Sequence, residues 1–356
     1  MNQDLTAFIR EDIRALHAYA VADVANDVIK LDAMELPYRF DVDLANELAQ
    51  ELAKAPINCY PNPATCGVQQ ALRDTFNIMP SADIALGNGS DELIQLLAML
   101  FAKPNATMLA VEPSFVMYKH NAALFGMNYV GVPLNPDFSL NLEATLAAIK
   151  QHNPALIFIA YPNNPTGVRF EREQVEAIVQ TASGLVVVDE AYGSFSDDSF
   201  LPQAGSVENL LVLRTLSKIG FAGLRLGYAA GHPSVMQELA KIVPPYNMNW
   251  LSITAAKFAL KHYDWIHSKI ELLKAERSRM LAALSEMPNT QAFASQANFI
   301  TVRLPDAVCA FETLKQHKIL VKKLHGSHAL LDNCLRLTIG TPEQNQQVLA
   351  VLKEVV

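Results

Sequence analysis

The sequence predicts an α/β protein: a mostly parallel sheet covered by helices on both faces, followed by a smaller α+β domain. Short apolar runs alternate with segments of helical periodicity from residue 84 to residue 230. Such alternation is typical of parallel strands joined by crossover helices. The pattern changes after Pro244-Pro245, where a long helical stretch precedes strands and helices of a different order. That change indicates a second domain.

Length and composition agree with two domains and exclude several classes of protein. The chain has 356 residues, of which 51% are hydrophobic and 18% are charged, so a sizeable core is expected and disorder is not. A net charge of -8 without a Lys/Arg run argues against a general nucleic-acid binder. No uninterrupted apolar stretch is long enough to span a membrane, and the first residues lack the apolar core of a secretory signal. Four cysteines without a CxxC pair indicate reduced thiols in a cytoplasmic protein without a metal site.

The chain divides into an arm (1–35), a large domain (36–245) and a small domain (246–356). The arm is expected to hold a short helix and then an extended piece at 28–31. Leucines at a spacing of four predict a helix over 43–54. The expected strands of the large domain are 84–86, 108–111, 129–132, 155–160, 185–188, 211–213 and 226–230. Its remaining expected helices are one that starts after residue 89 and runs through Leu100, and three that cover 115–125, 141–151 and 171–181.

The small domain begins with a helical stretch from Trp250 to Met287 that is expected to break near Tyr263. Its expected strands are 299–302, 320–321 and 334–339, and its expected helices are 306–317 and 342–353.

Candidate polar residues follow the strands of the large domain. Each of them ends a predicted strand or comes soon after one. In parallel sheets, sites form at the carboxyl ends of the strands, so we expect these side chains to converge. They are Ser90, Asn164, Asp189, Tyr192 and Lys218.

The segment 211–228 carries the most chemistry. After its apolar strand it presents Thr215, Ser217 and Lys218, and then Arg225. Two hydroxyls, an amine and a guanidinium make a suitable seat for a phosphate. A lysine that is partly desolvated beside another cation has a lowered pKa and can form a Schiff base. The alternative is a surface lysine in a serine-containing loop.

Two further sites are suggested by local pattern. Glycines followed by Ser90 and Asp91 at a helix start turn free backbone N–H groups toward an anion, although an ordinary N-cap has the same pattern. Asp189 ends an apolar strand, where an unpaired carboxylate is costly, so we expect it to have a cationic partner or to cap a helix.

Taken in order, several motifs resemble those of the fold-type I, class II-like pyridoxal-phosphate aminotransferases, and most closely the histidinol-phosphate aminotransferases. The resemblance covers nearly the whole chain and implies a sheet of the seven-stranded type. The motifs that carry it are KLDAME (30–35), YPNP (60–63), GNGSDE (87–92), NNPTG (163–167), DEAY (189–192), the lysine segment and CLRLTIGT (334–341).

This resemblance implies that the cofactor is pyridoxal 5'-phosphate. Lys218 would form the Schiff base and later carry a proton, and Asp189 would pair with the ring nitrogen. Asn164 and Tyr192 would donate to the phenolic oxygen, and Tyr118 would stack on the ring. The residues implied for the phosphate are Ser90, Asp91, Thr215, Ser217, Arg225 and Tyr60, the last crossing from the partner subunit of a homodimer.

The substrate residues follow from the same resemblance. Arg336, on a predicted apolar strand, would bind the α-carboxylate, with an internal salt bridge as the alternative. The family's phosphate-binding arginine has no arginine counterpart here, which leaves Lys322 or Lys323, or neither if both are solvated. Tyr19 would close over the substrate. The sequence Glu35-Leu36-Pro37 departs from the Glu-Asn-Pro common in the family.

The implied reaction converts histidinol phosphate and 2-oxoglutarate into imidazole acetol phosphate and glutamate, in a ping-pong cycle of histidine biosynthesis. Two enzymes of the same fold remain as alternatives, an aromatic aminotransferase and a threonine-phosphate decarboxylase. A regulatory module without turnover is a third, and the intact Lys218, Asp189 and Arg336 argue against it.

Overall fold

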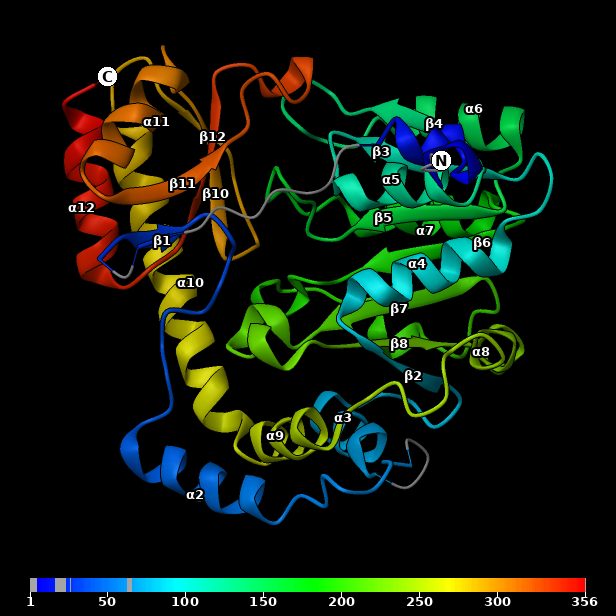
Figure 1. Cartoon of the computed structure of the whole chain (residues 1–356). Coiled ribbons are helices and arrows are strands. Elements are labelled where there is room, and N and C mark those ends of the chain that lie inside the picture. Colours follow the sequence, from blue (N-terminus) through cyan, green and yellow to red (C-terminus); the bar gives the residue numbers. More distant parts are fainter. Residues whose placement is uncertain (1–4, 17–23, 26, 63–65, 356) are drawn as a thin grey trace.

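The computed structural model describes residues 5–16, 24–25, 27–62 and 66–355 of the chain. It confirms the predicted α/β fold, because the described residues form a seven-stranded sheet and a five-stranded sheet. Figure 1 shows the larger sheet with its covering helices and the smaller sheet beside it. No helix within the described ranges is long and apolar enough to cross a membrane.

The seven-stranded sheet is mostly parallel, as predicted. Its order is β2-β8-β7-β6-β5-β3-β4, and only β8 runs antiparallel to its two neighbours. Its strands are β2 (Asp83–Asn88), β3 (Thr107–Glu112), β4 (Asn128–Pro133), β5 (Leu156–Ala160), β6 (Leu185–Asp189), β7 (Leu210–Thr215) and β8 (Leu226–Gly231).

The central strands are apolar because both of their faces are buried. In β6, Val186 and Val188 enter the hydrophobic core on one face of the sheet, whereas Leu185 and Val187 enter the core on the other. Successive side chains of a strand point to opposite faces, so a doubly covered strand reads as a continuous apolar run. All five residues of β6 are buried, including the carboxylate of Asp189 at its end.

Helices cover both faces of this sheet. The α4 helix begins at Ser90, directly after β2, and the α8 helix begins at Pro233, with a proline in its first turn. The predicted helices of this part are confirmed, and α3 and α8 are additions that the sequence pattern did not reveal. The helices between β1 (Ile29–Leu31) and α9 (Trp250–Lys261) are α2 (Val42–Ala53), which packs on α9, α3 (Val68–Phe76), α4 (Ser90–Phe101), α5 (Val116–Leu124), α6 (Leu142–His152), α7 (Arg172–Thr181) and α8 (Pro233–Ala240).

The five-stranded sheet combines the C-terminal part of the chain with a strand from the arm. The β1 strand pairs in parallel with β11, an association that the sequence did not predict. The predicted break in the long helical stretch is confirmed, since α9 and α10 meet at His262. The strands, in sheet order, are β1 (Ile29–Leu31), β11 (Ile319–Lys323), β12 (Cys334–Thr338), β10 (Phe299–Arg303) and β9 (Gln291–Ala292). The helices that follow α8 are α9 (Trp250–Lys261), α10 (Tyr263–Ser285), α11 (Ala307–Gln316) and α12 (Pro342–Lys353).

Short helical turns complete the described chain. The important one for the site is η4, which contains Lys218 and follows β7 directly. The short elements are η1 (Leu5–Phe8), α1 (Glu11–Arg14), η2 (Gly193–Phe195), η3 (Leu201–Gln203), η4 (Ser217–Ile219), η5 (Ala222–Leu224) and η6 (Ala329–Leu331).

At the edge of the larger sheet that is formed by β2, side chains form hydrogen bonds with the backbone. The carbonyl oxygens of alternate residues, Ala82, Ile84 and Leu86, accept hydrogen bonds from Arg73, Gln69 and Asn247, at 2.8, 2.8 and 2.9 Å. The N–H of Asn88 donates to the carboxylate of Glu92 at 2.7 Å. These side chains supply hydrogen-bond partners to backbone groups where the sheet itself provides no further strand.

Candidate active site

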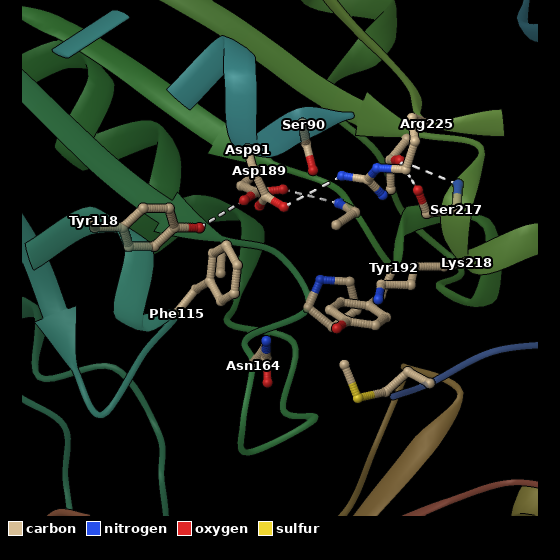
Figure 2. A pocket seen from close by; sticks show the side chains of 15 residues that line it. Ser90, Asp91, Phe115, Tyr118, Asn164, Asp189, Tyr192, Ser217, Lys218 and Arg225 are labelled. Carbon is tan, nitrogen blue, oxygen red and sulfur yellow. Dashed lines mark hydrogen bonds and ion pairs between the residues drawn. The ribbon is translucent and has the colours of Figure 1, made fainter. Parts of the chain in front are cut away.

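A pocket lies where the parallel strands end, and it contains most of the predicted site residues. The empty space inside it, part of which is open to solvent, is about 570 Å³. Figure 2 shows the side chains turned into it. They belong to Met34, Ser90, Asp91, Phe115, Tyr118, Ala160, Pro162, Asn164, Asp189, Ala191, Tyr192, Thr215, Ser217, Lys218 and Arg225.

The Lys218 amine is buried in the lining of this pocket. Its Nζ atom donates a hydrogen bond to the carbonyl oxygen of Ala33 at 3.2 Å and lies 5.8 Å from the centre of the Tyr192 ring. Burial, with the positive charge of Arg336, lowers the pKa of Lys218 to about 8. Near neutral pH a fraction of this amine is therefore uncharged and able to attack a carbonyl.

Asp189 lies at the floor of the same pocket. Its Oδ2 atom accepts a hydrogen bond from the hydroxyl of Tyr118 at 2.7 Å, and its Oδ1 atom accepts one from the N–H of Ala191 at 3.0 Å. Burial raises the pKa of Asp189 to about 6 although these two donors lower it. Both donors are neutral, so a cation placed in the pocket would strongly favour the ionised carboxylate.

An anion cradle lies across the pocket, at the start of α4. The backbone approaches so closely here that a Cβ on Gly227 would lie 2.4 Å from the backbone nitrogen of Ser90. The Arg225 guanidinium lies 3.6 Å from the Asp91 carboxylate, and both side chains are about half exposed. A helix N-terminus beside an arginine binds anions through its free N–H groups and its dipole. The hydroxyls of Thr215 and Ser217, 2.9 Å apart, lie in the same lining.

Arg336 contacts the pocket through Asn164. Its Nη1 atom donates to Asn164 Oδ1 at 2.7 Å, and its Nη2 atom donates to the carbonyl oxygen of Asp32, also at 2.7 Å. The guanidinium is buried and lies 5.3 Å from the centre of the Phe299 ring. These two contacts are with neutral oxygens, and a substrate carboxylate could replace either of them with a charge-assisted pair.

The pocket's aromatic side chains have different positions. The ring of Tyr192 is buried and packs edge-on against Phe299. Tyr118 is fully buried, lies parallel to Phe158 at 4.5 Å, and presents its hydroxyl to Asp189. This enclosed position does not fit the predicted stacking role of Tyr118. Phe115, one helical turn earlier, is only partly buried and also lines the pocket.

The two candidate lysines of β11 point in different directions. Lys322 pairs with Arg336 across the antiparallel ladder, and residues directly opposite each other share a face of the sheet. Lys323 pairs with Leu335, and its Nζ atom lies 5.5 Å above the ring of Phe311 on α11. Only Lys322 is therefore on the same face as Arg336. Neither lysine lines the pocket itself.

Tyr19 falls outside the described residues, and Tyr60 lies apart from this arrangement. Tyr60 is 81% exposed and stacks on Tyr246, with ring centres 4.8 Å apart, rather than lining the pocket of its own chain.

The sequence did not predict that residues 32–34 of the arm contribute to the site. Met34 lines the pocket, with its N–H bound to Thr338 Oγ1 at 3.2 Å and its carbonyl oxygen to Asn298 Nδ2 at 2.9 Å. The carbonyl oxygen of Asp32 accepts a hydrogen bond from Arg336, and that of Ala33 accepts one from Lys218. The KLDAME motif (30–35) contains these residues, but its residue types do not indicate that their backbone groups would form hydrogen bonds in the site.

These groups fit the predicted pyridoxal 5'-phosphate. The cofactor carries an aldehyde, a ring nitrogen that can be protonated and a phosphate. The pocket offers an amine of lowered pKa, a buried carboxylate that has only neutral donors in the described part of the chain, and an anion cradle.

Comparisons with known proteins point to one family. The family model of "Aminotransferase class I and II" matches residues 26–352. A histidinol-phosphate aminotransferase of Neisseria meningitidis serogroup B is 60% identical over 99% of this chain and 97% of its own length. A protein of the same name from Chromobacterium violaceum is 54% identical over 99% of both chains. The crystal structure of a Sinorhizobium meliloti histidinol-phosphate aminotransferase in complex with pyridoxal-5'-phosphate superposes with a TM-score of 0.82, at 25% identity, over 92% of this chain and 90% of that one.

Proposed function

The chain belongs to the class I and II aminotransferases, and on that basis we propose that it exchanges the amino group of histidinol phosphate with 2-oxoglutarate. The products are imidazole acetol phosphate and glutamate, and the reaction belongs to histidine biosynthesis. The observation that carries this proposal is the 60% identity to a histidinol-phosphate aminotransferase over nearly the full length of both chains.

The cofactor is pyridoxal 5'-phosphate, which supplies an electron sink for the pair released at the substrate α-carbon. Lys218 would hold its aldehyde, and the Asp189 carboxylate would pair with its protonated ring nitrogen. Asn164 and Tyr192, which line the pocket, would donate to the phenolic oxygen. We assign the ring face to Phe115. The residues proposed for the phosphate are Ser90, Asp91, Thr215, Ser217 and Arg225.

Lys218 also serves as the proton carrier of the reaction. Its Nζ atom would take the proton from the α-carbon of the amino substrate and deliver it to the carbon that carried the aldehyde of the cofactor. A pKa of about 8 keeps both the amine and the ammonium form accessible near neutral pH, as a residue that accepts and donates in turn requires.

Arg336 orients the substrate through its α-carboxylate. Two neutral oxygens, of Asn164 and Asp32, hold the guanidinium in the free protein, so its donors are already aligned before a substrate arrives. A two-pronged contact fixes the α-carbon relative to Lys218, and such positioning is a major source of rate in enzymes.

We assign the substrate phosphate to Lys322 rather than to Lys323. The assignment is supported by the register that puts Lys322 opposite Arg336. A substrate held by its carboxylate at Arg336 would extend its phosphate over the same face of the small sheet. Lysine binds phosphate as a point charge, without the two-pronged geometry of arginine.

We further propose a homodimer in which Tyr60 of one subunit reaches the cofactor phosphate of the other. Support comes from its exposure of 81% and from the neighbouring Ile57 and Tyr246, exposed by 75% and 52%. Large apolar side chains gathered at the surface are typical of a contact with another chain. A cytoplasmic location is also proposed, and it is supported by the four free cysteines.

The function is tested with separate half-reactions. The purified protein with its cofactor is mixed with histidinol phosphate, glutamate, phenylalanine or threonine phosphate, and the absorbance of the bound cofactor is followed. Conversion by histidinol phosphate and by glutamate, with imidazole acetol phosphate as a product, is the expected result. Faster conversion by phenylalanine, or release of carbon dioxide from threonine phosphate, would instead identify one of the alternative enzymes.

A further inference from the structure

The Asp189 carboxylate is held from a second element of the fold, the helix α5. The hydroxyl of Tyr118 donates to Asp189 Oδ2 at 2.7 Å, while the other oxygen accepts the N–H of Ala191 from the turn that follows β6. Figure 2 shows this hydroxyl directed at the carboxylate from the side of the pocket where α5 lies. Each carboxylate oxygen has two lone pairs, so both contacts leave capacity for a ligand.

Packing fixes the position of the Tyr118 hydroxyl. The ring has no exposed surface, lies parallel to Phe158 of β5 at 4.5 Å, and meets the edge of Phe115 at 5.7 Å. A ring enclosed in this way cannot turn its hydroxyl elsewhere without disturbing the core. Burial and the adjacent Asp189 raise the pKa of Tyr118 well above its ordinary value, so its oxygen keeps the proton that it donates.

The other groups near Asp189 oppose its ionisation. Burial is the largest effect, and the carboxylates of Asp91 on α4 and Glu190, the next residue in the chain, add to it. Glu190 is itself paired with Arg214 at 2.7 Å. Tyr192, which follows in the same turn, is buried and contributes no positive charge. Tyr118 and the Ala191 N–H are thus the two contacts that favour the charged carboxylate.

We propose that Tyr118 is a positioning residue, whose hydroxyl keeps the Asp189 carboxylate ionised and oriented toward the ring nitrogen of the cofactor. This inference rests on the proposed function, because it takes the ring nitrogen to be the partner of Asp189. It gives Tyr118, the aromatic residue within α5, a role distinct from stacking.

The test is the substitution Tyr118→Phe, which removes the hydroxyl and keeps the ring. Protein freed of its cofactor by dialysis is titrated with pyridoxal 5'-phosphate between pH 5.5 and pH 8, and the dissociation constant is measured at each pH. In the wild type the affinity should fall below about pH 6, where Asp189 becomes protonated. For Tyr118→Phe the affinity should begin to fall at a pH about one to two units higher. Loss of one hydrogen bond to the charged carboxylate should raise the pKa of Asp189 by about that amount. Near pH 6 the variant should therefore bind roughly 10-fold more weakly than the wild type.

Tyr161→Phe is the matched control. The Tyr161 hydroxyl also donates to a carboxylate, Asp198 Oδ2 at 2.8 Å, and its ring is likewise fully buried. Both variants should lower the melting temperature, but only Tyr118→Phe should move the pH dependence of cofactor binding. Equal pH profiles for Tyr118→Phe and the wild type would overturn the proposal and leave Tyr118 with a purely structural role.

A second pair of proteins keeps the proposal testable if Tyr118→Phe does not fold. In the Asp189→Asn background the same change should alter neither the pH profile nor, to any large extent, the melting temperature. A double variant as unstable as Tyr118→Phe alone would contradict the coupling. The proposed function fails separately, if wild-type protein binds the cofactor but does not react with histidinol phosphate.

Discussion

Substitution of Lys322 tests how the enzyme recognises its substrate. Lys322→Ala removes a positive charge from the face of the small sheet that carries Arg336, and Lys323→Ala removes the same charge from the opposite face. The two residues are neighbours on one strand and both are exposed, so they form a matched pair. Only Lys322→Ala should weaken the binding of a substrate phosphate.

The expected magnitude follows from the kind of contact. A hydrogen bond to a charged group contributes about 1.5–3 kcal/mol, which corresponds to roughly a 10- to 100-fold change in KM. Because Lys322 is exposed and acts as a point charge, we expect the lower end, about 10-fold, at low ionic strength. The difference from the wild type should shrink as salt is added, since salt screens exposed charges.

The assay compares both half-reactions in wild type, Lys322→Ala and Lys323→Ala. Glutamate has no phosphate, so its half-reaction should change little in any variant. Losses of the same size for histidinol phosphate and glutamate would show a general effect on the fold of the small domain. No loss in Lys322→Ala, or an equal loss in Lys323→Ala, would refute the assignment and favour an aromatic substrate.

Three further predictions concern the cofactor and the subunit contact. Asp189→Asn keeps the shape of the side chain but removes its charge, and kcat should fall by a factor of about 10² or more. Near-wild-type turnover of this variant, in stopped or continuous assays, would exclude an ion pair between Asp189 and the ring nitrogen. The variants Tyr60→Ala and Lys218→Ala should each be inactive, but a mixture of the two should regain activity after reassembly, because one site of each mixed dimer then holds both native residues. A mixture no more active than either variant alone would argue against a Tyr60 that reaches the site of the other subunit. The cofactor-free protein should become more stable as pH rises from about 8 to 10.5, where unfolded Lys218 binds a proton that the folded form has lost. Lys218→Met should therefore raise the free energy of unfolding at pH 7 by up to about 3 kcal/mol, with the gain vanishing above pH 10.5, as chemical denaturation would reveal.

The sequence was sufficient to find the strand ends and the residues on them. Asp189 is the last residue of β6 and Lys218 follows β7, as the apolar runs before them predicted. Apolar runs and helical periodicity are local patterns, so they can be read from the sequence without knowledge of the tertiary structure. The KLDAME motif is also visible in the sequence, but the hydrogen bonds of its backbone with Arg336 and Lys218 are not. The pairing of β1 with β11 joins residues that are far apart in the chain, and no local pattern encodes such a pairing.

Side-chain direction was the other quantity that sequence could not supply. Phe115 and Tyr118 are one turn apart at the start of α5, so both are plausible neighbours of a ligand, and only the packing on Phe158 distinguishes them. Lys322 and Lys323 alternate across a strand, and the register with Arg336 decides which one shares its face. The α8 helix could have been found from Pro233 at its first turn, a position that suits proline.

The side chains bound along β2 have a consequence for how copies of this protein can meet. An outer strand with open carbonyl and N–H groups is a template on which a strand of another molecule can add, and the result is aggregation. Side chains already bind three alternate carbonyl oxygens along this edge, those of Ala82 just before β2 and of Ile84 and Leu86 within it, and the Glu92 carboxylate binds the N–H of Asn88. A foreign strand would have to displace each of these contacts in turn. In the folded protein these contacts therefore disfavour the addition of a strand from another molecule at this edge of the sheet.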